Sequence, residues 1–179
     1  SEGKKTKEIS RSHKLIREKS GLITIIGGKW TTYRKMAQDT LDLAIRYMHI
    51  PTKDCITERY QIHGSRKNPD FSDPLYVYGT DADEIRNLVA SSPAMAEKLH
   101  PDYAYTVGEV TWLVRNEMPR TLEDVLARRL RILFLDARAA MAMAPKVAGI
   151  LATEWGKDET WTSAQVKAFN EVASNYILN

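Results

Sequence analysis

The sequence predicts a mainly α protein in which a C-terminal helical bundle follows a single strand-turn-helix unit. The chain has 179 residues, 43% hydrophobic and 27% charged, a composition typical of a globular protein. One short β-branched run occurs near the start, whereas apolar residues recur at helical spacing beyond residue 80. A lone cysteine and the absence of a long apolar run or signal peptide lead us to expect a cytoplasmic protein without disulfides.

Positive charge is concentrated at the start of the chain. Residues 1–35 carry ten Lys and Arg against three Asp and Glu, although the whole chain has a net charge of only +3. Such a basic end is more often a solvated arm than a site for an anion or a nucleic acid.

The run Leu22–Ile26 is bounded by glycines and predicts a strand buried on both faces. After the Gly27-Gly28 turn, Thr31 or Thr32 is the expected N-cap of a helix that ends before Pro51. No other run supplies a partner strand, and the chain begins without Met. We therefore expect residues 1–50 to be the tail of a sheet-containing domain whose body lies upstream.

Residues 51–80 are rich in proline, glycine, Asp, Asn and Ser, and they predict a connector with at most a short strand at Tyr60–Ile62. Residues 81–179 then form the expected all-α domain. Its first helix is predicted from Asp81, which with Glu84 resembles a capping box, to Ser91, and two more are expected at 93–99 and 105–116.

The remaining helices are predicted from caps and prolines. Thr121 and Asp124 indicate a helix over 122–135, with Phe134 on its core face, and residues 137–144 either continue it or begin again at Asp136. Pro145 suits the first turn of a helix ending near Gly156. Thr162 with Gln165 predicts the start of the last helix.

Three segments resemble one family. They are Gly21-Leu-Ile-Thr-Ile-Ile-Gly-Gly-Lys-Trp-Thr-Thr-Tyr-Arg-Lys-Met-Ala37, Ser10-Arg-Ser-His13 and Arg120-Thr-Leu-Glu-Asp-Val-Leu-Ala-Arg-Arg129. The chain resembles the C-terminal part of FAD-dependent glycerol-3-phosphate dehydrogenases and α-glycerophosphate oxidases. It lacks the Gly-x-Gly-x-x-Gly fingerprint of that family, so it looks like the last third of such an enzyme.

The resemblance implies a parent enzyme that binds FAD, oxidises sn-glycerol 3-phosphate to dihydroxyacetone phosphate and passes electrons to quinone or oxygen. Residues 1–50 then belong to its FAD- and substrate-binding domain, and the parent is peripheral at the inner face of the membrane. The isolated chain is expected to be inactive and without FAD, because the pyrophosphate-binding unit is missing. Homodimer formation, acceptor docking and simple stabilisation all stay open as roles of the bundle.

The turn after the strand is the candidate site. Glycines, a helix N-terminus and a lysine together suit an anion, although a tight turn with an exposed lysine explains the same spacing. By resemblance this turn contacts the flavin, and Lys29 is the catalytic residue that stabilises negative charge on the reduced ring. Arg11 matches the substrate-binding arginine of the family. The implied cofactor-binding residues are Gly27, Gly28, Lys29, Trp30, Thr31 and Thr32.

Other residues favour structural roles. His49, His63, His100 and Cys55 lack metal-ligand spacing, so no metal site is expected. Four arginines between residues 128 and 138 lie among acidic residues, which favours ion pairs over nucleic acid. Trp112, Trp155 and Trp161, with Met141 and Met143, are expected in the core of the bundle. The alternative to the enzyme is a free-standing helical binding module with a basic N-terminal arm.

Overall fold

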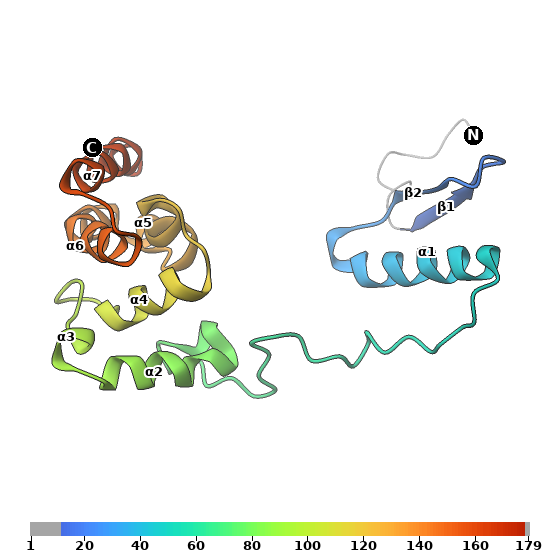
Figure 1. Ribbon diagram of the computed structural model, residues 1–179, viewed down its shortest axis with the longest axis horizontal. Coiled ribbons are helices and arrows are strands. Elements are labelled where there is room, and N and C mark those ends of the chain that lie inside the picture. Colours follow the sequence, from blue (N-terminus) through green and yellow to red (C-terminus); the bar gives the residue numbers. More distant parts are fainter. Residues whose placement is uncertain (1–11, 178–179) are drawn as a thin grey trace. The chain divides into compact units, whose positions relative to one another are not determined.

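The computed structural model describes residues 12–177, which are mainly helical, as the sequence predicts (Figure 1). The chain divides into two compact units, Ser1–Ile62 and His63–Asn179, and each is described by itself. Arg11 lies outside the described residues. Between residues 12 and 177, no helix has both the length and the hydropathy that crossing a bilayer requires.

The first unit is a two-stranded hairpin followed by one long helix. Strand β1 (His13–Arg17) pairs antiparallel with β2 (Ile23–Gly27), with His13 opposite Gly27. The hairpin turn is closed by a hydrogen bond from the Gly21 N–H to the Glu18 carbonyl oxygen, 3.0 Å, and Gly21 has a φ of +90°. A 3-10 turn, η1 (Trp30–Thr32), leads into α1 (Tyr33–Met48).

The hairpin corrects two expectations for the strand near residue 22. A partner strand is present in this chain, because β1 pairs with β2 along its whole length. The strand is also exposed on much of its surface within this unit, since Ile26 is 54% and the preceding Leu22 58% accessible. The predicted helix is confirmed and ends at Met48, where His49 adopts a left-handed conformation and donates its N–H to the Ile45 carbonyl oxygen.

The connector after α1 contains no strand among its described residues, so the short strand that the sequence allowed at residues 60–62 does not form. The Arg34 guanidinium joins this segment to α1 by donating to Thr57 Oγ1 at 3.2 Å and to Glu58 Oε1 at 3.3 Å.

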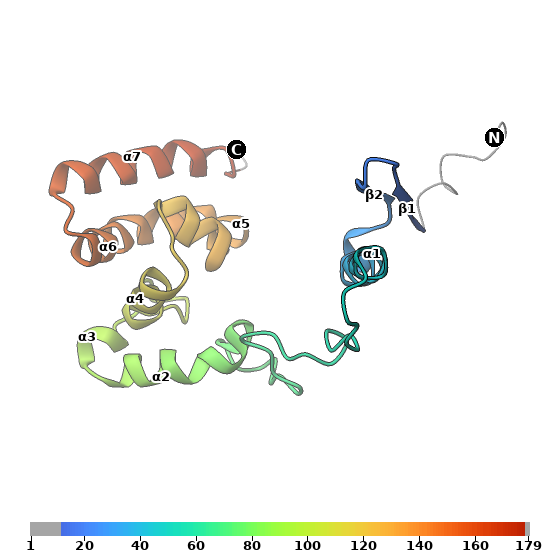
Figure 2. The ribbon, with the colours of Figure 1, turned by 45° about the vertical axis from the view of Figure 1, so that its right-hand side comes forward.

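The second unit is a helical bundle, in which α6 and α7 lie side by side (Figure 2). Its core consists of fully buried aliphatic side chains such as Ile85, Leu113, Leu126, Met143 and Leu151. Its elements are η2 (Tyr76–Asp81), α2 (Ala82–Ala90), α3 (Pro93–Ala96), α4 (Val107–Asn116), the π-helical turn η3 (Asp124–Arg129), α5 (Ile132–Leu135), α6 (Ala137–Trp155) and α7 (Glu159–Ser174).

The helix predicted over 122–135 is interrupted. Thr121 and Asp124 do form the predicted reciprocal cap, since the backbone N–H of each donates to the side chain of the other, at 3.0 and 3.2 Å. The chain then forms η3 and breaks at Arg131, which has a φ of +60°. This break turns Phe134 outward, so it is 54% exposed and the core placement expected for it is wrong.

Two predicted helix starts are also wrong. Pro145 lies inside the continuous helix α6, which begins after the N-cap Asp136. Helix α7 begins at Glu159 after the N-cap Asp158, whose Oδ1 accepts the Trp161 N–H at 2.8 Å, so Thr162 lies within the helix.

The capping box expected at Asp81 is absent as well. Its carboxylate bonds His63 Nε2 at 2.7 Å, while Glu84 accepts the Trp112 indole N–H at 3.0 Å.

Candidate functional site

The turn between β2 and α1 is built on two glycines in conformations that other residues avoid. Gly27 and Gly28 have φ values of +84° and +83°. A Cβ on Gly27 would lie 2.8 Å from the Ser12 carbonyl oxygen, and one on Gly28 would lie 2.4 Å from Met36 Sδ. Glycine is therefore favoured at both positions independently of any ligand, at Gly27 by its φ and the nearby backbone oxygen and at Gly28 by its φ, since the Met36 side chain is flexible.

Thr32 fixes the start of the helix. Its hydroxyl accepts the Lys29 N–H at 3.0 Å and donates to the Lys29 carbonyl oxygen at 2.9 Å. The Thr32 N–H also donates to that carbonyl oxygen, at 2.9 Å. Within the described residues, the N–H groups of Trp30 and Thr31 have no such acceptor, as is usual in a first helical turn.

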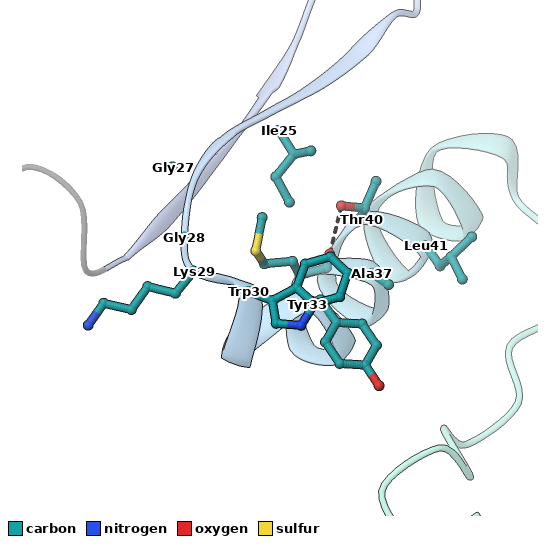
Figure 3. Close-up of a pocket in the computed structure, with 10 residues that line it drawn as sticks. Ile25, Gly27, Gly28, Lys29, Trp30, Tyr33, Ala37, Thr40 and Leu41 are labelled. Carbon is teal, nitrogen blue, oxygen red and sulfur yellow. Dashed lines mark hydrogen bonds between the residues drawn. The ribbon is translucent and has the colours of Figure 1, made fainter. Parts of the chain in front are cut away.

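A hollow of about 710 Å³ opens beside this turn, and Figure 3 shows the residues that line it. The Trp30 and Tyr33 rings stack with their centroids 5.9 Å apart. Trp30 is 88% exposed, which is unusual for so large an apolar side chain. The lining residues are Ile25, Gly27, Gly28, Lys29, Trp30, Tyr33, Met36, Ala37, Thr40 and Leu41.

The structure brings together four of the six residues that the resemblance assigns to the cofactor. Gly27, Gly28, Lys29 and Trp30 line the hollow, whereas Thr31 and Thr32 do not. The Lys29 side chain extends away from the rings of Trp30 and Tyr33 (Figure 3). Arg11 belongs to the residues that the structure does not describe.

A polar cluster next to the turn was not predicted from the sequence. Asp39 Oδ2 bonds His13 Nε2 at 2.9 Å, and Asp39 Oδ1 pairs with Lys35 Nζ at 2.9 Å. The bond from Lys35, followed by that from His13, lowers the pKa of Asp39. This cluster ties β1 to α1 at the residue opposite Gly27. Only the i,i+4 spacing of Lys35 and Asp39 is visible in the sequence, because His13 lies 26 residues away.

The hollow offers an apolar bed, two aromatic rings, one lysine on its rim and the Trp30 N–H, which has no acceptor within the described residues. That combination suits a flat, largely apolar group with partial negative charge at one edge. A metal ion has no comparable site, because residues 12–177 contain no cluster of three His, Cys, Asp or Glu side chains suited to bind one.

Two of the four arginines between residues 128 and 138 form the ion pairs that the sequence favours, whereas no ion pair of Arg131 or Arg138 occurs within the described residues. Arg128 pairs with Glu123 at 2.7 Å and Asp124 at 3.0 Å, and Arg129 pairs with Glu117 at 3.1 Å. Of the tryptophans and methionines expected in the core, Trp112 is 6% exposed and Met143 is fully buried. Trp155 and Trp161 are half-buried and contact each other edge to face, 5.8 Å between centroids.

Comparison with known proteins gives a family match over residues 22–162, to the C-terminal domain of alpha-glycerophosphate oxidase. A probable mitochondrial glycerol-3-phosphate dehydrogenase of Caenorhabditis elegans is 34% identical, over 97% of this chain and 26% of that protein. The mitochondrial glycerol-3-phosphate dehydrogenase SDP6 of Arabidopsis thaliana is 31% identical, over 96% of this chain and 34% of that protein. A probable mitochondrial counterpart from Dictyostelium discoideum is 34% identical, over 97% of this chain and 29% of that protein.

These relatives correct the location expected for the protein and show how much of each relative the chain covers. The cytoplasmic location is wrong, because the three relatives are named mitochondrial. Composition and the lack of an apolar run carry no information on the compartment, which explains the error. The chain spans at most about a third of the length of these relatives.

Proposed function

This chain belongs to the family of the C-terminal domain of alpha-glycerophosphate oxidase, and on that premise we propose that it is the C-terminal part of an FAD-dependent enzyme. The enzyme oxidises sn-glycerol 3-phosphate to dihydroxyacetone phosphate and delivers the electrons to quinone or oxygen. The names of the relatives support the substrate. The observation that carries the proposal is the hollow beside the Gly27-Gly28 turn, which lies within the matched residues.

The residues of the hollow fit one edge of a flavin. The ring system is flat and largely apolar, so it suits the bed formed by Ile25, Ala37 and the exposed ring of Trp30. When bound there, a flavin would supply the hydride acceptor for the alcohol, and the residues of the turn would face the negative charge of its reduced form. The Trp30 N–H, which has no acceptor among the described residues, supports the proposal that this helix start donates to an anionic edge of the ring.

Lys29 supplies the full positive charge. Its backbone is fixed by the two bonds with Thr32, whereas its exposed side chain has freedom to reach a ring that rests on the hollow. A cation there lowers the free energy of the reduced anionic ring more than that of the neutral oxidised ring. Lys29 therefore raises the reduction potential without being consumed.

Arg11 is proposed to bind the substrate. It precedes β1 by two residues, and the first residue of β1, His13, is anchored to Asp39 on α1. A planar guanidinium donates two parallel hydrogen bonds to two oxygens of a phosphate, which the lysine ammonium cannot do. We place the complete enzyme in the mitochondrion, like the relatives named above.

Anaerobic reduction of the complete enzyme tests the proposal. Adding sn-glycerol 3-phosphate should bleach the flavin absorbance, whereas glycerol, which lacks the phosphate, should not. Arg11→Ala should slow the bleaching by roughly a hundredfold or more, since one preorganised charged donor is lost. A complete enzyme that contains no flavin, or whose flavin glycerol 3-phosphate leaves oxidised, contradicts the proposal.

A further inference from the structure

The helical unit contains a pocket of about 620 Å³ at the surface formed by α2, α3 and the start of α4. It belongs to a different unit from the hollow beside Gly27, so the proposed flavin and substrate roles do not use it. Leu75, Ile85, Val89 and Ala90 give it an apolar wall, and Ile85 is fully buried.

A buried acid also lines this pocket. Glu109 on α4 is only 5% exposed, and its Oε1 accepts the Tyr78 hydroxyl at 2.7 Å. Burial raises the pKa of Glu109, although the bonds from Tyr78 and from the Thr106 N–H oppose that effect. Within residues 12–177 no lysine, arginine or histidine forms an ion pair with Glu109. A carboxylate removed from water without a cation is costly, so a cationic ligand would gain strongly here.

The strong hydrogen-bond donors around the pocket are already engaged. The Arg86 guanidinium pairs with Asp73 and, at 2.5 Å, with Asp83. The Tyr103 hydroxyl donates to Asp136 at 3.0 Å, and the Tyr105 hydroxyl donates to the Leu130 carbonyl oxygen at 3.0 Å. An anionic ligand would therefore have to break existing bonds.

The two tyrosine rings in the wall favour a cation as well. Tyr103 and Tyr105 stack with their centroids 6.1 Å apart and their planes at 17°. Both residues line the pocket, and their hydroxyls are held by other residues. Aromatic faces attract organic ammonium ions, which bury an apolar body at the same time.

We propose that this pocket binds a small organic ammonium ion, with its charged nitrogen paired with Glu109 and its apolar body against Val89 and the Tyr103 and Tyr105 rings. Such a ligand supplies the cation that Glu109 lacks and leaves the engaged donors undisturbed. The pocket is larger than a simple phenylalkylamine needs, so it accommodates a longer apolar body.

Calorimetric titration of this chain near pH 7 tests the proposal with two probes of nearly equal shape, 2-phenylethylammonium and neutral 2-phenylethanol. The ammonium probe should bind at least about tenfold more tightly, because a hydrogen bond to a charged group is stronger than a neutral one. Glu109→Gln keeps an acceptor for Tyr78 and should abolish the difference between the probes. Glu171→Gln, which removes an exposed carboxylate on α7, should leave both affinities unchanged.

A second variant locates the binding. Ala90→Leu adds bulk at an exposed helical position in the pocket wall and should weaken the ammonium probe about tenfold or more. If a thermal melt shows that Glu109→Gln does not fold, the affinity of Ala90→Leu for the ammonium probe tests the proposal instead. Equal affinities for the two probes, no binding by the unmodified chain, or undiminished preference in a folded Glu109→Gln chain overturns the proposal. So does undiminished binding by Ala90→Leu.

Discussion

Gly79 has the least room for a side chain among the described glycines of the bundle. It has a φ of +55°, and a Cβ there would lie 1.6 Å from the Gly64 carbonyl oxygen, which also accepts the Thr80 N–H at 3.2 Å. Because that obstacle is backbone, Gly79→Ala should lower the free energy of unfolding by about 2 kcal/mol or more. Urea denaturation followed by circular dichroism measures this change.

Gly149 is the matched control for that variant. It lies on the exposed side of α6, and nothing is within 4 Å of an added Cβ. Gly149→Ala should raise the free energy of unfolding by about 0.5–1 kcal/mol. If the two variants change stability alike, the close approach of Gly79 to Gly64 is not present in solution.

The buried Glu109 also predicts a pH dependence. Its pKa in the folded chain lies above the ordinary value of 4.5, so the folded state holds this proton more tightly than the unfolded state. Stability contributed by the protonated acid is therefore lost as pH rises from about 4.5 towards the raised pKa. Glutamine does not titrate, so the stability of Glu109→Gln does not fall for this reason as pH rises. Urea titrations should show the free energy of unfolding of Glu109→Gln rising relative to that of the unmodified chain between pH 4 and pH 7. A difference that is constant over this range contradicts the assignment.

At the level of elements, the sequence located most helices but misplaced several ends. Asp158 and Thr162 both suit an N-cap, and only packing decides that α7 starts four residues earlier. Pro145 is tolerated inside α6, although proline more often begins a helix. The strand β1 was missed because its five residues contain only two apolar side chains, Leu15 and Ile16, within a basic stretch.

The start of α7 gives a direct test of this capping assignment. Asp158→Ala removes the acceptor of the Trp161 N–H and should cost about 1 kcal/mol of unfolding free energy, whereas Asp158→Asn should cost much less. Thr162→Ala should have a small effect, because its hydroxyl only donates to the Asp158 carbonyl oxygen within the helix. Thermal melts in which Thr162→Ala is the more damaging variant would restore the start predicted from the sequence.

For the whole molecule, the division at residue 62 predicts independent folding of the bundle. The core side chains of the second unit contact one another, from Ile85 on α2 to Phe169 on α7. A fragment of residues 63–179 should therefore unfold cooperatively in a calorimetric scan, at nearly the temperature of the same transition in the full chain. A broad, featureless scan of a soluble fragment contradicts this prediction.

The candidate site was only partly predictable from the sequence. Its glycines, Lys29 and Trp30 follow from the strand-turn-helix pattern together with the family resemblance. The contribution of Tyr33, Met36 and Leu41 to the hollow depends on how α1 packs against β2, which spacing alone does not determine. The His13–Asp39 bond depends on the hairpin that the sequence analysis missed.

The reduction potential of the flavin in the complete enzyme, measured without substrate, tests the central claim most directly. Lys29→Ala should lower it by on the order of 30 mV, which corresponds to a loss of about 1.4 kcal/mol in a two-electron couple. Lys19→Ala, an exposed lysine in the hairpin turn, and Arg11→Ala should leave it nearly unchanged. A potential that is the same with and without Lys29, or that Arg11→Ala shifts equally, would contradict the placement of the Gly27–Thr32 turn at the flavin.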